Sequence, residues 1–276
     1  MLKTRIITAV VLLAILLPAL FYPQPSAFQA VALVMIGAAA WEWGKLNGCA
    51  QGASVLIAAC TLILCATAWF YQLFNQQTGL LWLLTGAAWV LVSSWLLARG
   101  PTAWQKIPKP LRLLFGVLAL CAAWLALAQA RMRGIEFLLS VLVLVWVADI
   151  GAYFAGRAFG GRFTKSKLAP SISPGKTWEG VWGAMGCVLL MAGVWAFSSS
   201  GNLYAQLQAR HGTVFLLVAA LFLVAMSVVG DLIESLVKRA AGAKDSSQLL
   251  PGHGGVLDRI DALLPALPLA MMLASL

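Results

Sequence analysis

The sequence has 276 residues, of which 62% are hydrophobic and only 10% are charged, and its formal net charge is +10 at pH 7. The mean hydropathy of +0.90 excludes a soluble globular domain, because about 25% of the residues in such domains are charged. A nucleic-acid-binding domain is also excluded, since the basic residues are not interleaved with aromatic residues on a soluble surface. We therefore expect an all-α, polytopic integral membrane protein with no nucleic-acid partner.

Apolar stretches of roughly 20 residues recur along the chain, and each is long enough to cross a bilayer as an α-helix. The first stretch resembles a signal peptide, but no A-x-A cleavage site follows it, so we expect an uncleaved first helix. The last stretch is the weakest candidate, because Asp258, Arg259 and Asp261 lie at its start. The nine predicted spans are residues 6–22, 27–44, 53–71, 79–98, 111–130, 135–156, 178–198, 213–236 and 256–275.

The 19 lysines and arginines predict the orientation of these spans. With a cytoplasmic N-terminus, all of them except Arg131, Arg133 and Arg210 lie in cytoplasmic connections, as the positive-inside rule requires. The two charged connections, residues 157–177 and 237–255, then face the cytoplasm together, where one site formed by both has access to nucleotides. We divide the chain into a lipid-facing scaffold of transmembrane helices, residues 1–130, and a catalytic transmembrane region, residues 131–276.

The first charged segment, residues 149–180, starts with an acid inside an apolar stretch. An intramembrane carboxylate such as Asp149 favours a functional site over a structural ion pair. Residues 173–177, Ser-Pro-Gly-Lys-Thr, end like a Walker A loop, but that motif requires glycine where the chain has Pro170. We therefore expect Ser173 or Thr177 to cap a helix that starts near Trp178. The connection also carries five basic residues: Arg157, Arg162, Lys165, Lys167 and Lys176.

The second charged segment, residues 227–261, contains five of the nine acids of the chain. A predicted helix ends near Gly242, and one of its faces carries Asp231, Ser235, Lys238 and Arg239. The loop after it contains Lys244, Asp245, His253, Gly254 and Gly255. A further predicted helix presents Asp258 and Asp261 on one face, with Arg259 between them.

This pattern predicts a phosphate-and-metal site in preference to a set of interfacial charges. Carboxylate oxygens from Asp231 and Asp258 suit Mg²⁺, which is commonly held by one or two carboxylates plus substrate phosphates. The basic side chains neutralise phosphate oxygens, and the glycine pair lets the backbone approach a ligand closely. His253 either carries a proton or donates to phosphate or backbone.

The charged segments together resemble the CDP-diacylglycerol synthase family, also called the phosphatidate cytidylyltransferase family. The resemblance covers residues 145–261. Its motifs are Asp149-Ile-Gly-Ala-Tyr153, Ser173-Pro-Gly-Lys-Thr-Trp-Glu-Gly180, Ser235-Leu-Val-Lys-Arg239, Lys244-Asp245, Pro251-Gly-His-Gly-Gly255 and Leu257-Asp-Arg-Ile-Asp261. It implies that CTP and phosphatidate react to give CDP-diacylglycerol and pyrophosphate with Mg²⁺, and that a potassium ion and a homodimer are involved. The implied location is the inner (plasma) membrane, with the active site on its cytoplasmic side.

The resemblance also leads to hypotheses for individual residues. Asp231 and Asp258 hold Mg²⁺, directly or through water, while the diacyl chains stay in the cytoplasmic leaflet. Asp149 and Asp245 are further candidates, and we expect Asp149 to face the same polar cavity. The expected catalytic residues are Asp231, Lys238, Asp258 and Asp261. The expected substrate-binding residues are Ser173, Lys176, Thr177, Ser235, Arg239, Lys244, His253, Gly254, Gly255 and Arg259.

Two other functions are compatible with an acid cluster in a membrane protein. A CTP-dependent lipid or polyprenol kinase would transfer the γ-phosphate and release CDP instead of pyrophosphate. An ion-coupled transporter would use Asp149 and Asp231 as coupling sites. Transporters of that kind are built from similar halves with paired broken helices, whereas the two halves of this chain differ in charge.

Overall fold

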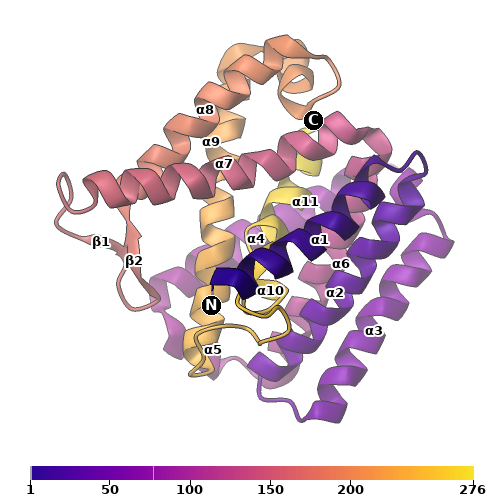
Figure 1. Cartoon of the computed structure of the whole chain (residues 1–276), viewed down its shortest axis with the longest axis vertical. Helices are drawn as coiled ribbons and strands as arrows, with labels where there is room; N and C mark the ends of the chain where they lie inside the picture. Colours follow the sequence, from indigo (N-terminus) through magenta and orange to yellow (C-terminus); the bar gives the residue numbers. More distant parts are fainter. Residues whose placement is uncertain (1, 77) are drawn as a thin grey trace.

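A computed structural model describes residues 2–76 and 78–276 of the protein. The chain folds into a bundle of α-helices with one small β-hairpin (Figure 1), and the start of the first helix contacts Pro251 and Gly252. In chain order the elements are α1 (Leu2–Phe21), α2 (Pro25–Leu46), α3 (Gln51–Phe70), the 3-10 turn η1 (Leu73–Asn75), α4 (Gly79–Arg99), α5 (Pro101–Lys106), α6 (Lys109–Arg133), α7 (Ile135–Phe159), β1 (Lys167–Ala169), β2 (Ser173–Thr177), α8 (Trp178–Ser198), α9 (Leu203–Ala240), α10 (Leu257–Ile260) and α11 (Leu263–Leu273).

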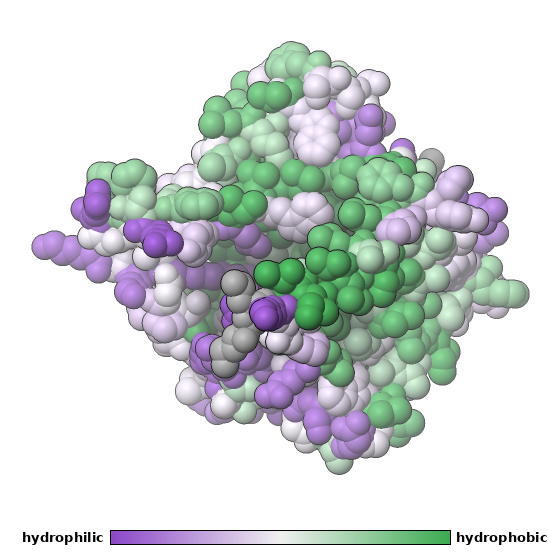
Figure 2. Space-filling model, in the orientation of Figure 1, coloured by the Kyte–Doolittle hydropathy of each residue, from purple (hydrophilic) through white to green (hydrophobic). Residues whose placement is uncertain are grey.

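The helices have the length and surface of a multi-pass membrane protein. Within residues 2–76 and 78–276, eight of them are long and apolar enough to cross a bilayer: α1, α2, α3, α4, α6, α7, α8 and α9. Figure 2 shows a hydrophobic surface over α1 and the neighbouring helices, while hydrophilic residues gather at the hairpin and at the lower ends of the helices. Aliphatic side chains of α1 such as Ile6 and Val10 are exposed, as expected where a helix faces lipid.

The predicted ninth span, residues 256–275, is not among the eight described helices that are long and apolar enough to cross a bilayer. The structure divides this stretch into α10 and α11, although Asp261 and Ala262 between them keep helical backbone angles. The number of spans therefore stays a prediction. The apolar residues of α11 are buried against α4, α6 and α9.

The hairpin is a small departure from the all-α expectation. β1 and β2 pair antiparallel, with Lys167 opposite Thr177 and Ala169 opposite Ser173. The N–H of Ile172 donates to the carbonyl of Ala169 at 3.1 Å and closes the turn. Pro170 and Pro174 flank this turn, and each lacks the N–H that a helix would need. The connection 157–177 is therefore ordered by strand pairing rather than being a simple loop.

The longest helix, α9, runs through the molecule and carries Asp231 and Glu234, two of the five acids of the second charged segment. It begins at Leu203, earlier than predicted, where the Asn202 side chain caps it by accepting the N–H of Ala205 at 2.9 Å. The helix is kinked at Gly212, whose φ of 83° suits glycine, so the predicted start at residue 213 is the start of its second part. The predicted end near Gly242 is confirmed, since α9 stops at Ala240.

Small residues bring α7 and α8 close together. Gly180 and Gly183 of α8 pack against Ala152 and Ala155 of α7, and a Cβ at Gly183 would come much closer than 3.0 Å to the Ala155 side chain. This contact sets the distance between Asp149 on α7 and the hairpin that precedes α8.

We expect Gly183→Val to lower thermal stability, because the added side chain forces α7 and α8 apart. Overpacking of this kind costs about 1–3 kcal/mol, which corresponds to a drop of roughly 5 °C in the midpoint of thermal unfolding. The midpoint is measured in detergent micelles. Gly186→Val is the matched control in the same helix, since a Cβ at Gly186 has no neighbour within 4 Å. Equal midpoints for the two variants would contradict the tight contact.

Candidate functional site

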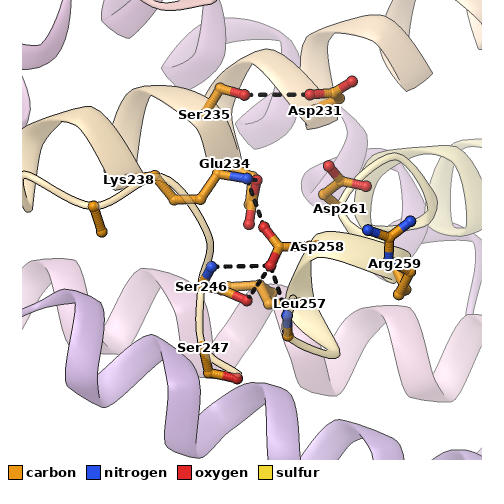
Figure 3. A network of polar contacts seen from close by, with 12 residues as sticks. Asp231, Glu234, Ser235, Lys238, Ser246, Ser247, Leu257, Asp258, Arg259 and Asp261 are labelled. Atoms are coloured by element: carbon orange, nitrogen blue, oxygen red, sulfur yellow. Dashed lines mark hydrogen bonds and ion pairs between the residues drawn. The ribbon is translucent and has the colours of Figure 1, made fainter. Parts of the chain in front are cut away.

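Asp258 lies at the centre of a hydrogen-bond network at the start of α10 (Figure 3). Its Oδ1 accepts a hydrogen bond from Lys238 Nζ at 2.6 Å. Its Oδ2 accepts three, from the N–H and hydroxyl of Ser246 (2.9 and 2.8 Å) and from the N–H of Gly255 (2.8 Å). Burial opposes ionisation of Asp258, but the hydrogen bonds from Lys238, Gly255 and Ser246 hold its pKa below the ordinary value. The network therefore fixes a charged carboxylate in one position.

Lys238 joins α9 to α10 through two ion pairs. Its ammonium contacts Glu234, one turn earlier on α9, and also Asp258. The side chains of Lys238 and Glu234 are only 12% and 3% exposed. Removing one partner of a buried pair is strongly destabilising, because the other charge is left uncompensated. In this structure Lys238 positions Asp258, and its contact with a substrate phosphate stays a prediction.

The two charged connections meet at Asp231. Lys176 of β2 pairs with Asp231 Oδ2 at 2.6 Å, and the Ser235 hydroxyl donates to Oδ1 at 3.3 Å. The Asp231 side chain is 34% exposed, so the ion pair is open to solutes. Asp231 and Lys176 line a cavity of about 430 Å³, together with Asp149 and Thr177. The structure thus brings Asp149 into the same cavity as expected, while its role stays a prediction.

Two of the predicted substrate-binding arginines contact the backbone of the protein itself. Arg239 donates to the carbonyls of Ile172 and Ala243, both at 3.2 Å, and so joins the hairpin to the loop after α9. Arg259 donates through Nε and Nη2 to the carbonyl of His253, at 3.1 and 2.7 Å. These contacts shape the loop, and binding of substrate by Arg239, Arg259 and His253 stays a prediction.

The glycine pair of the loop packs against the polar network. Gly254 has a φ of 79°, and a Cβ there would lie 2.7 Å from Asp258 Oδ2. A Cβ at Gly255 would come much closer than 3.0 Å to Ser246 Oγ. The predicted close approach of the backbone therefore occurs, but toward side chains of the protein rather than toward an open ligand groove.

The remaining predicted binding residues lie around this centre. Thr177 caps α8, as expected, by accepting the N–H of Gly180 at 3.2 Å. Ser173 begins β2 and is partly buried, whereas Lys244 and Asp245 are exposed on the loop after α9. Lys244 is free to reach a soluble anion, and Asp245 lies beside it.

Asp231 lines the cavity whereas Asp258 and Asp261 are not among its lining residues, and binding of Mg²⁺ by Asp231 and Asp258 stays a prediction. Burial and the neighbouring Asp231 carboxylate raise the pKa of Asp261, as crowded negative charges do. Asp258 Oδ1 accepts one hydrogen bond, which leaves a lone pair for a metal or its water. Among the described residues, no three His, Cys, Asp or Glu side chains could hold a metal by themselves. A metal here needs substrate oxygens as well, as is usual for Mg²⁺.

Sequence reasoning missed Glu42, which we had assigned to a scaffold region. Glu42 is fully buried in α2, and its carboxylate accepts hydrogen bonds from the loop that holds Asp258. The donors belong to Ser246, Ser247, Val256 and Leu257. Glu42 lies inside a predicted apolar span, as Asp149 does. A carboxylate in a membrane span indicates a functional site, so the same argument applies to both residues.

Comparisons with known proteins identify the family of this chain. Residues 3–276 match the profile described as the cytidylyltransferase family. The chain is 40% identical over 270 residues to a protein named phosphatidate cytidylyltransferase from Pseudomonas aeruginosa, covering 97% of this chain and 95% of the relative. Proteins of the same name from Haemophilus influenzae (39% identity, 97% and 96% covered) and Brucella suis (38% identity, 100% and 94% covered) are also similar. The similarity includes the helical scaffold as well as the charged segments.

Proposed function

The chain belongs to the cytidylyltransferase family, and from this membership we propose that it transfers the cytidylyl group of CTP to phosphatidate. The products are CDP-diacylglycerol and pyrophosphate. Such a reaction joins a membrane lipid to a soluble nucleotide, so it needs a polar, phosphate-binding cavity beside lipid-facing helices. The observation that supports this most directly is the Lys176–Asp231 ion pair in a cavity between the hairpin, α7, α8 and α9.

In the proposed reaction, a phosphate oxygen of phosphatidate attacks the α-phosphorus of CTP in line. The bond from the α-phosphorus to the oxygen that bridges to the β-phosphate breaks, and pyrophosphate leaves with that oxygen. The lipid phosphate is already anionic near neutral pH and needs little deprotonation. The protein must therefore bring two anions together and stabilise the charge that develops on the leaving pyrophosphate.

The residues around the cavity suit these tasks. The Lys176 ammonium and the Thr177 hydroxyl face the cavity from the hairpin and would hold a phosphate of either substrate, and the exposed Lys244 would reach the nucleotide. Asp231 and Asp258 would hold Mg²⁺ together with substrate oxygens, and the bound ion would neutralise phosphate charge. The potassium ion and the homodimer implied by the resemblance stay predictions.

We also infer that the site faces the cytoplasm from the plasma membrane. The distribution of lysine and arginine supports this orientation, and CTP is available on that side. Membrane-impermeant labelling of a cysteine placed at the exposed Lys244 would test it: spheroplasts should resist labelling and inverted vesicles should react.

The function is tested with purified protein, phosphatidate and CTP labelled in either the α- or the γ-phosphate. We expect pyrophosphate release that requires phosphatidate, with the α-label appearing in the lipid. Transfer of the γ-label to lipid, with release of CDP, would instead establish the kinase alternative. Unchanged CTP, accompanied by ion-dependent solute uptake into vesicles, would establish the transporter alternative.

Removing divalent metal is expected to abolish turnover, because Asp149, Asp231 and two substrate phosphates carry more negative charge than Lys176 and Arg157 of the cavity offset. Pyrophosphate release in excess EDTA should fall to about 1% or less of its starting rate, as expected when a charge-neutralising group worth several kcal/mol is lost. Adding Mg²⁺ in excess of the chelator should restore it. Full activity in EDTA would contradict the metal assignment without affecting the assignment of substrates.

A further inference from the structure

Glu42 is a buried carboxylate far from the other acids in sequence. It belongs to α2, and its side chain is 0% exposed. Charged side chains are almost never fully buried unless they are paired. In the part of the chain that the structure describes, no basic side chain forms an ion pair with Glu42. Its negative charge is instead stabilised by hydrogen-bond donors.

Four hydrogen-bond donors converge on the two carboxylate oxygens. Oε1 accepts from the Ser247 hydroxyl at 2.5 Å and from the N–H of Val256 at 2.9 Å. Oε2 accepts from the N–H of Leu257 at 2.6 Å, and it shares the single proton of the Ser246 hydroxyl, 3.2 Å away, with Asp258. Hydrogen bonds to an ionised acceptor are roughly twice as strong as neutral ones. Because the donors come from both ends of residues 246–257, one carboxylate fixes both ends of this loop.

The same loop fixes Asp258. The Ser246 hydroxyl lies 3.2 Å from Glu42 and 2.8 Å from Asp258, and the N–H of Ser246 donates to Asp258. Leu257, whose N–H is bound by Glu42, directly precedes Asp258 in the chain. Gly255 lies against both Ser246 and Glu42, where a side chain would not fit. A shift of the Glu42 carboxylate would therefore move the donors that hold Asp258.

We propose that Glu42 is a positioning residue of cytidylyl transfer, an inference that rests on the proposed function. Its carboxylate holds residues 246–257 in place and thereby sets the position of Asp258. Glu42 acts from beneath the loop, because its side chain has no exposed surface with which to touch a substrate. The N-terminal half of the chain thus supplies a component of the site.

The first test is Glu42→Gln. Glutamine keeps one acceptor oxygen, but its NH₂ group must face the N–H of either Val256 or Leu257, donor against donor. We expect kcat to fall about 10- to 100-fold, as for outer-shell partners of other metal sites, with KM for CTP changed less than about 3-fold. The midpoint of thermal unfolding should stay near that of the wild type, while the amides of residues 246–257 exchange hydrogen faster.

A double-variant cycle separates positioning from a general structural role. If Glu42 acts through Asp258, then adding Glu42→Gln to Asp258→Asn should slow the enzyme little beyond Asp258→Asn alone. Losses that multiply independently would mean that the two residues act separately and would overturn the inference.

Two further variants serve as a control for changing a buried residue of α2 and as an alternative to Glu42→Gln. Gln29→Leu changes another buried polar residue of α2, and near-wild-type kcat is expected; a loss as large as that of Glu42→Gln would overturn the inference. Ser247→Ala removes a single donor and should lower kcat about 3- to 10-fold, which keeps the test decisive if Glu42→Gln fails to fold.

Wild-type protein without pyrophosphate release would refute the proposed function. Active wild type with unimpaired Glu42→Gln and Ser247→Ala would refute only the positioning role.

Discussion

Asp258→Asn is expected to lower kcat roughly 100- to 1,000-fold, a loss of about 2.7–4 kcal/mol at 1.36 kcal/mol per factor of ten. The Asp258 carboxylate accepts from Lys238 on one oxygen and from three donors of Ser246 and Gly255 on the other. Asparagine has one acceptor oxygen and one NH₂ group, so one of these two sets faces a donor whichever way the amide turns. The Lys238 ammonium also loses one of its two anionic partners, and the proposed metal loses a charged ligand.

The measurement is phosphatidate-dependent pyrophosphate release by purified protein over a range of Mg²⁺ concentrations. Glu136→Gln is the matched control, because Glu136 is an exposed acid in the first turn of α7 and its charge has no part in the network. We expect the control to retain wild-type kcat. Turnover by Asp258→Asn close to that of the wild type, with the same Mg²⁺ dependence, would rule out both the metal role and the importance of the network.

Gly255→Ala is expected to reduce turnover about 100-fold although it adds only a methyl group. The new Cβ would come much closer than 3.0 Å to Ser246 Oγ and Glu42 Oε1. Both atoms belong to one buried hydrogen-bond cluster, in which Ser246 Oγ contacts the other Glu42 oxygen and Glu42 Oε1 accepts from Ser247. Neither atom can move without breaking bonds to the loop. The loop must therefore shift as a whole, and catalytic geometry is sensitive to displacements of about 1 Å.

The control for this variant is Gly193→Ala in α8, where a Cβ has no neighbour within 4 Å. That substitution should leave kcat unchanged and slightly raise stability, since alanine favours helix more than glycine. Far-ultraviolet circular dichroism of Gly255→Ala should match the wild type, because the long helices do not depend on the loop. An active Gly255→Ala protein would show that the loop packs less tightly than the structure indicates.

The sequence predicted the helical membrane class and the meeting of the two charged connections. Apolar runs and their flanking charges depend on local composition, which is why most spans appear close to where they were expected. The segment 256–275 departs from the expectation of one long helix, because it is divided into α10 and α11 and the apolar residues of α11 are buried against other helices. Length and hydropathy describe a segment by itself, and they do not show which neighbours will bury it.

The sequence could not reveal which side chains of the site contact one another. The pattern of Asp231, Lys238 and Asp258 indicated phosphate and metal chemistry, but it did not indicate that Lys238 lies between Glu234 and Asp258. Likewise, the glycine pair suggested room for a ligand, whereas the room is taken by Ser246 and Asp258. Such choices depend on tertiary packing, which brings together groups far apart in the chain.

The long separation between Glu42 and its donors has a consequence for how the protein is made. Ser246 and Leu257 follow Glu42 by 204 and 215 positions, which a ribosome adding 5–20 residues per second covers in roughly 10–40 s. Throughout that interval α2 is already synthesised, but the donors that will hold its Glu42 carboxylate have not yet been added. Residues 246–257 thus complete the contacts of a helix that was translated near the beginning.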